Sequence, residues 1–374
     1  MNTNDLLVIE LSGTPRERGR IYGEAAKPLI ANIVEGWRMD LGNYGRNSET
    51  AESIGPDDYL REFFSETDYL SSIKKWTPDL FEEVKGIAEG SGQTFDNILG
   101  IQLLDEEWIF GLRRRLDRPT TKCTAFGAPD HPDGVSYAGQ NMDIPSWVED
   151  NQVLIRVMPT ENSPEALVFT MAGTIALNGL NASGLGVTCN TLSQLNHSVY
   201  GLPIAFIVRA LLEQNTIDEA ERFLQTINHA SGQNYILSSL GDMRCFECCG
   251  GSAVRYAPEN INGRVFHTNH PFVNKDRRQK ETRKHMENSE ARLNSICDRL
   301  GDVSQQVTLD AAKASLASHD DPANPVSRPI DNERISIGFT AGSSIYELGA
   351  VPRLHLASGP PCETDFELFE FKTL

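Results

Sequence analysis

The sequence has no uninterrupted run of 18 apolar residues, which a membrane-spanning helix requires. Its first residues, MNTNDLLVIELSG, also lack the basic segment and apolar core of a secretion signal, so we expect a cytoplasmic protein. Basic residues are few, since 34 Lys and Arg face 52 Asp and Glu and give a formal net charge of −18. This charge argues against nucleic acid and against membrane surfaces as partners.

Disulfide and metal frameworks have little support. The seven cysteines are an odd, scattered set, which is typical of free thiols. Cys245, Cys248 and Cys249 form a CxxCC run without a second ligand pair, so we interpret them as small core residues rather than a zinc site. We therefore expect no metal and no bound cofactor.

The order of elements predicts a layered α+β fold. Capping boxes at Thr14–Glu17 and Thr216–Glu219 and the Thr77-Pro78 pair predict helix starts. One helix is expected to run from Pro15 past Trp37, and helical patterns continue to about residue 108. Short strand patterns follow and are interrupted by helices near 203–227, 274–300 and 308–318. Such an order indicates sheets packed together and covered by helices.

The stretch PTTKCTAFGAPDHPDGVSYAGQNMDIP, residues 119–145, carries the main catalytic candidate. A turn at 131–134 separates Cys123 from a predicted strand at 135–140 that leads to Asn141 and Asp143. A hairpin of this length places Cys123 and Asp143 side by side on neighbouring strands.

This arrangement suits a cysteine that becomes the first residue of a cleaved chain. A free α-amine has a pKa of about 7.7–8.0, so it can take a proton near neutrality without a histidine. The carboxylate would hold that amine beside the sulfur. The spacing alone favours a buried, inert cysteine, and other parts of the chain are needed to reverse that preference.

Two further side-chain types at 267–270 are candidates for acyl chemistry. His267 or His270 could serve as the base of an ordinary Cys–His hydrolase. Asn269 ends a predicted strand, where its amide could stabilise a tetrahedral oxyanion. An asparagine that only terminates a strand has the same pattern.

Seven segments together resemble the acyl-coenzyme A:6-aminopenicillanic acid acyltransferase family of the N-terminal nucleophile hydrolases. They are GTPRERGRIYGE, EEVKGIAEGSG, KCTAFGA, GQNMD, GLNASGLGVTCNTLS, GLPIAFIVRALLE and GRVFHTNHPF, and they extend over nearly the whole chain. The resemblance implies a four-layer αββα sandwich and a precursor that cuts itself before Cys123. Residues 1–122 and 123–374 would then form two fragments, partners in one integrated domain.

The resemblance also implies roles for individual residues. Cys123 would be the nucleophile, Asp143 the partner of its amine and Asn269 the oxyanion donor. The substrate would be a small acyl amide or acyl thioester, with a coenzyme A thioester as a candidate acyl donor. Candidates for substrate binding are Asn141, Asn190, Ser327 and Arg328.

The cut would fall between Lys122 and Cys123, and here the sequence departs from the family, which has glycine before the nucleophile. Glycine tolerates strained backbone that lysine does not. An uncleaved, non-catalytic binding protein is therefore the alternative to a self-processing enzyme.

Overall fold

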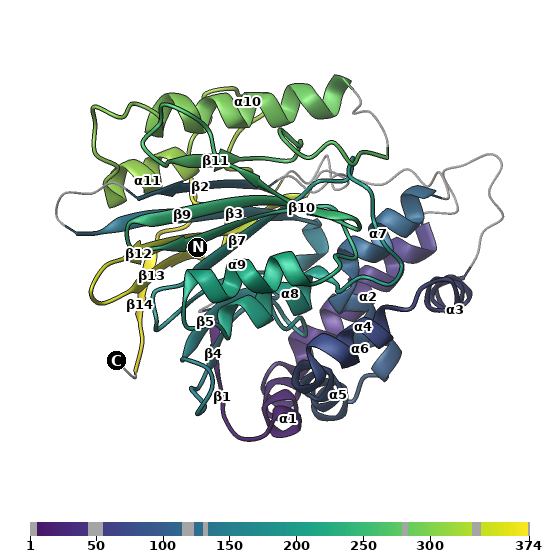
Figure 1. Ribbon diagram of the computed structural model, residues 1–374. Coiled ribbons are helices and arrows are strands. Elements are labelled where there is room, and N and C mark those ends of the chain that lie inside the picture. Colours follow the sequence, from purple (N-terminus) through teal and green to yellow (C-terminus); the bar gives the residue numbers. More distant parts are fainter. Residues whose placement is uncertain are drawn as a thin grey trace.

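The computed structural model describes residues 6–43, 55–113, 123–129, 134–278, 283–330 and 338–372. Two β-sheets pack face to face, and helices cover the outer face of each sheet (Figure 1). The expected α+β fold with αββα layers is confirmed. No helix among these residues is long and apolar enough to cross a membrane.

The first sheet has the strand order β1-β4-β5-β6-β7-β8-β9-β10. Its strands are β1 (Leu7–Leu11), β4 (Gln152–Val157), β5 (Ala166–Met171), β6 (Asn178–Asn181), β7 (Gly186–Thr191), β8 (Gln233–Ser239), β9 (Asp242–Cys249) and β10 (Ser252–Tyr256). Among the described strands of this sheet, only β1 pairs in parallel, against β4. The segment before Cys123, which the sequence suggested was helical, therefore also contributes an edge strand.

The second sheet has the order β11-β2-β3-β12-β13-β14. Its strands are β2 (Thr124–Ala128), β3 (Ser136–Ile144), β11 (Val265–His267), β12 (Phe339–Leu348), β13 (Arg353–Ala357) and β14 (Glu367–Glu370). β12 is continuous from Phe339 to Leu348, with a bulge between Thr340 and Gly342.

Helices α8 (Ile204–Leu212) and α9 (Ile217–Thr226) pack on the first sheet, while α10 (Arg283–Leu300) and α11 (Leu309–Leu316) pack on the second (Figure 1). The remaining helices gather beside the first sheet. They are α1 (Pro15–Ala25), α2 (Lys27–Asn43), α3 (Pro56–Glu66), α4 (Tyr69–Trp76), α5 (Pro78–Ser91), α6 (Phe95–Gln102) and α7 (Leu104–Arg113), with a 3₁₀ turn, η1, at Ser146–Val148.

The single helix expected from Pro15 past Trp37 is two helices. The capping box at Thr14 starts α1 as predicted, but α1 ends at Ala25 and α2 begins at Lys27. Pro28 explains the break, because it has no N–H to donate and its ring clashes with the carbonyl four residues earlier.

Helices α1 and α5 touch through glycines four residues apart on each helix. A Cβ atom on Gly19 would lie 1.9 Å from the main-chain oxygen of Glu83, and one on Gly90 would lie 2.3 Å from that of Arg20. Cβ atoms on Gly23 and Gly86 would lie 2.5 Å and 2.3 Å from main-chain oxygens of the facing helix. The two helices therefore pack backbone to backbone, which only glycine permits.

The alternation of side chains along β2 sets the direction of the candidate nucleophile. Thr124 contacts Arg292 of α10, and Phe126 packs with Ile296 and Leu300 of the same helix. Since successive side chains of a strand point to opposite faces, Cys123 is directed to the other face, between the two sheets.

Candidate active site

The β2–β3 hairpin brings Cys123 and Asp143 together, as expected from their spacing. Thr124 pairs with Asn141, so Cys123 lies opposite the following residues of β3. The main-chain N–H of Asp143 is close enough to the Cys123 sulfur to favour its ionised form. Lys122, on the other side of the predicted cut, lies outside the described residues.

Cys123 is buried, with 7% of its surface exposed. Burial and the negative charge of Asp143 raise its pKa to about 12, against the opposing effects of the Asp143 N–H and the Arg292 charge. In the uncut chain the sulfur is therefore protonated at neutral pH. A base must take the proton before the sulfur can attack an acyl group.

Thr340 fixes the carboxylate of Asp143. Its hydroxyl donates to Asp143 Oδ1 at 2.7 Å and accepts the main-chain N–H of Arg328 at 2.9 Å. The Thr340 N–H in turn donates to the Arg328 carbonyl at 2.9 Å. Thr340 thus brings the backbone of Arg328, one of the predicted binding residues, next to Asp143.

Arg292 of α10 is a residue of this site that the sequence reasoning missed. Its guanidinium is fully buried and donates to the Cys123 carbonyl at 2.5 Å, to Thr124 Oγ1 at 2.9 Å and to Asn269 Oδ1 at 2.9 Å. Burial lowers its pKa to about 10, while the charge of Asp143 acts in the opposite direction. At neutral pH Arg292 therefore keeps its positive charge.

A signal for Arg292 was present in the helical periodicity of α10. Ser289, Arg292, Ile296 and Leu300 recur at intervals of three or four residues, and all four are buried. An arginine within the buried stripe of a helix is uncommon unless it has partners, so its position pointed to a function.

Asn269 lies directly beyond the end of β11 and is held on both sides of its carboxamide. Its Nδ2 donates to the Thr191 carbonyl at 3.1 Å, and its Oδ1 accepts from Arg292. Its main-chain N–H donates to Ser289 Oγ at 2.9 Å. The Nδ2 carries two hydrogens, and the bond to Thr191 uses one of them.

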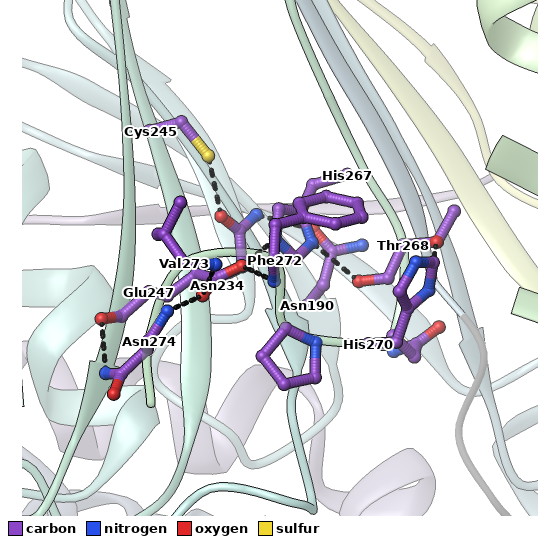
Figure 2. A network of polar contacts seen from close by, with 12 residues as sticks. Asn190, Asn234, Cys245, Glu247, His267, Thr268, His270, Phe272, Val273 and Asn274 are labelled. Carbon is purple, nitrogen blue, oxygen red and sulfur yellow. Dashed lines mark hydrogen bonds and ion pairs between the residues drawn. The ribbon is translucent and has the colours of Figure 1, made fainter. Parts of the chain in front are cut away.

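Three of the predicted binding residues lie in structural hydrogen bonds. Asn141 Nδ2 donates to the carbonyls of Leu316 at 2.7 Å and Val326 at 3.0 Å, which fastens α11 to the sheet. Asn190 Oδ1 accepts from Asn234 Nδ2 at 3.0 Å (Figure 2).

Ser327 Oγ accepts the main-chain N–H of Cys362 at 3.3 Å. For Asn141, Asn190 and Ser327 a role in substrate binding stays a prediction.

His267 belongs to a buried network around Glu247 (Figure 2). Its Nε2 lies 3.0 Å from Glu247 Oε1, and its Nδ1 lies 2.8 Å from the Thr268 carbonyl. The same carboxylate accepts the N–H groups of Val273 at 3.0 Å and Asn274 at 2.7 Å. Burial raises the Glu247 pKa, but the hydrogen bond and charge of His267 and the backbone N–H donors outweigh it and hold the pKa low.

His270 also has a hydrogen-bond partner of its own and is a weak base. Its Nδ1 lies 2.8 Å from Ser289 Oγ, and burial together with the charge of neighbouring groups lowers its pKa to about 4. Among hydrogen bonds between described residues, none joins His267 or His270 to Cys123. The geometry does not favour the ordinary Cys–His alternative.

An acidic side chain of α7 reaches the same strand ends. Asp105 Oδ2 accepts from Thr191 Oγ1 at 2.7 Å and from Gln233 Nε2 at 2.6 Å. Burial raises its pKa. Thr191 therefore joins Asp105 to Asn269, through its hydroxyl on one side and its carbonyl on the other.

The acyl-coenzyme A:6-aminopenicillanic acid acyl-transferase family model matches residues 130–333. This range is more than half of the chain; it begins after Cys123 and includes Asp143, Asn269, Arg292 and Arg328. The chain belongs to this family. Its activity accordingly falls in the class of acyl transfer.

A relative from Emericella nidulans, the 40 kDa form of acyl-coenzyme A:6-aminopenicillanic-acid acyltransferase, is 26% identical over 270 residues. The match covers 72% of this chain and 70% of the relative.

Three solved structures are similar at TM-scores below 0.5 and add nothing to the fold described above. An N-acylethanolamine-hydrolyzing acid amidase ortholog from Caenorhabditis elegans has a TM-score of 0.43 and 14% identity, and covers 60% of this chain and 92% of its own. Penicillin V acylase from Agrobacterium tumefaciens has a TM-score of 0.42 and 15% identity, and the match covers 67% of this chain and 87% of the acylase. A conjugated bile acid hydrolase variant from Clostridium perfringens has a TM-score of 0.42 and 13% identity, and the match covers 67% of this chain and 97% of the hydrolase.

Proposed function

We propose that this protein is a self-processing N-terminal-cysteine enzyme that cleaves or transfers the acyl group of a small acyl amide or acyl thioester. The observation that carries the proposal is the contact between Cys123 and Asp143. The thiol is buried and has a raised pKa, it touches the backbone of a fixed carboxylate, and the nearby histidines have other partners. An α-amine at Cys123 would supply the missing base.

Self-cleavage would begin when the Cys123 sulfur attacks the carbonyl carbon of Lys122. The peptide nitrogen leaves as the amine of Cys123, and the carbonyl is held as a thioester. Water hydrolyses that thioester and gives the Lys122 carboxylate, a free thiol and a free α-amine. Asp143 would hold the resulting amine close to the sulfur.

In each turnover the α-amine accepts the thiol proton as the sulfur attacks the substrate carbonyl. The second Nδ2 hydrogen of Asn269 would stabilise the oxyanion of the tetrahedral intermediate. The amine returns its proton to the leaving group, and the acyl group remains on Cys123 as a thioester. Water or an acceptor amine then attacks the thioester and frees the enzyme.

The two fragments should stay together after the cut. The strand β1 is hydrogen-bonded along β4, and the buried core includes residues from both sides of Cys123. A coenzyme A thioester enters this scheme as an acyl-donor substrate, as the name of the fungal relative suggests.

Intact-mass spectrometry of the purified protein tests this function. Wild type should give fragments 1–122 and 123–374, and incubation with N-hexanoylglycine or hexanoyl-coenzyme A should add a hexanoyl group to the second fragment. Cys123→Ala should give one uncut chain without an adduct. Cys189→Ala removes another buried cysteine and should be cut and acylated like wild type.

An uncut wild-type chain that takes up no acyl group would instead favour the binding protein suggested by Lys122.

A further inference from the structure

Arg292 connects two groups that the proposed mechanism requires to act together. One nitrogen of its guanidinium, Nη1, donates to the carbonyl of Cys123, and the other, Nη2, donates to Oδ1 of Asn269. Its Nε donates to Asn288 Oδ1 at 3.1 Å, four residues earlier on α10. The Arg292 side chain is therefore fixed by a residue of its own helix and extends from there to Cys123 and Asn269.

We infer that Arg292 is a positioning residue that fixes the amide of Asn269 in the orientation that presents its N–H to the oxyanion. This inference rests on the proposed function.

The chemistry of the two side chains supports this role. A guanidinium is only a donor, so the Asn269 atom that faces it must be the carbonyl oxygen. The Thr191 carbonyl is only an acceptor, so the atom that faces it must be the amide nitrogen. A flip of the carboxamide would place donor against donor and acceptor against acceptor, and both neighbours therefore oppose it.

Stability alone does not account for a charge at this position. Taking a charge out of water is costly, and its interactions in the interior repay this cost only when their geometry is excellent. Arg292 is fully buried at a position of α10 that is followed by Ile296 and Leu300 in the same stripe. A methionine would fill the volume without the cost of burying a charge, but it could not hold the Asn269 oxygen.

The same donors act on the nucleophile. Because Arg292 also binds the carbonyl of Cys123, it links the backbone of the nucleophile to the side chain of Asn269. The distance between the attacking sulfur and the oxyanion donor is then set through one planar guanidinium. Errors of about 1 Å in such a distance cost on the order of a hundredfold in rate.

A double-mutant cycle with Arg292→Lys and Asn269→Ala tests the inference. Asn269→Ala should lower kcat by about 10²–10³-fold, which is the usual loss for an oxyanion donor. Arg292→Lys keeps the charge but loses the paired geometry, and should lower kcat by about 10–100-fold with KM changed less than about threefold. In the Asn269→Ala background, Arg292→Lys should change kcat by less than about threefold, because its effect is exerted through Asn269.

Alkylation by iodoacetamide distinguishes this role from a merely structural one. That reaction needs the Cys123 sulfur but forms no oxyanion, so Arg292→Lys should keep the alkylation rate of Cys123 within about fivefold of wild type. Arg264→Met is the matched control. Arg264 is also buried and donates to main-chain carbonyls, at Leu300, Asp302 and Gln305, and its loss should reduce stability without changing kcat of the folded protein.

Wild-type protein that is cut and active, together with additive effects of Arg292→Lys and Asn269→Ala, would overturn the role of Arg292 alone. Equal losses in alkylation and in acyl transfer would overturn it as well. A wild-type chain that remains uncut and does not react with acyl donors would overturn the proposed function, and the role of Arg292 with it.

Discussion

The hydroxyl of Thr340 lies 2.7 Å from the carboxylate of Asp143, which is 197 residues away in the sequence. The same hydroxyl accepts the N–H of Arg328, so its hydrogen is directed to the carboxylate. This bond holds the Asp143 carboxylate in place near the Cys123 thiol of the uncut chain. It would hold the carboxylate in the same way beside the proposed α-amine of the cut chain.

Thr340→Val keeps the shape of the side chain and removes this bond. Hydrogen bonds to charged groups are worth about 1.5–3 kcal/mol, so kcat should fall by about 10–100-fold if Asp143 must be held beside the amine. The measurement is steady-state turnover of the processed enzyme, with processing followed by intact mass.

Thr188→Val is the matched control for Thr340→Val. Thr188 is also a buried strand residue, and its hydroxyl has no hydrogen-bond partner among the described residues. Its substitution should leave kcat unchanged and should not reduce stability. A Thr340→Val enzyme as active as Thr188→Val would show that Asp143 does not depend on Thr340.

Gly19→Ala should separate α1 from α5. The added Cβ would meet the Glu83 main-chain oxygen at 1.9 Å, and backbone cannot move aside as a flexible side chain can. Overpacking typically costs about 1–3 kcal/mol of unfolding free energy, and the main-chain contact places this site at the upper end or beyond. Urea unfolding measures the loss.

Gly55→Ala serves as the control for the helix contact. A Cβ on Gly55 would meet nothing within 4 Å, and the residue has an ordinary extended backbone at the start of α3. Its substitution should cost no more than about 1 kcal/mol, because alanine is a poorer N-cap than glycine but meets no steric clash here. Equal losses at Gly19 and Gly55 would contradict the close packing of α1 on α5.

Because of Glu106, the free energy of unfolding should decrease as the pH rises. Burial, and then the charge of Asp105, raise its pKa from 4.5 to about 8. Between these values the folded chain keeps a proton that the unfolded chain has lost, so the unfolding free energy decreases with increasing pH. At about 1.4 kcal/mol per pKa unit, the upper limit of the decrease is about 5 kcal/mol.

Glu106→Gln should remove this slope, since the amide is neutral and its oxygen can accept the same bonds from Ile204 N–H and Ser231 Oγ. Urea unfolding at pH 5, 6.5 and 8 would measure the difference between variant and wild type. Glu24→Gln, on the exposed side of α1, should keep the wild-type slope. A Glu106→Gln slope that matches wild type would rule out a protonated Glu106 in the folded chain.

Local sequence patterns were enough to place part of the site. The hairpin spacing predicted that Cys123 and Asp143 are neighbours, and a strand end was expected just before Asn269. Each of these expectations depends on one turn or one strand, so the residues that determine it are close in sequence.

Arg292, Thr340 and the pairing of β1 with β4 could not be predicted in the same way. Arg292 is 169 residues from Cys123, and it reaches the nucleophile because α10 packs on the outer face of the second sheet. β1 joins β4 about 146 residues later, as in the pair Leu7 and Val153. Such contacts depend on how layers pack, and the period of a single segment does not encode the packing of layers.

N-terminal sequencing of an active preparation shows whether an α-amine exists beside the Cys123 sulfur. A self-processed enzyme should give two sequences in equal amounts, one from the initiator region and one that begins Cys123-Thr124-Ala125, with activity that rises as the second appears. A fully active preparation that yields only the sequence of the initiator region would contradict the proposed mechanism, because no amine would then exist beside the Cys123 sulfur.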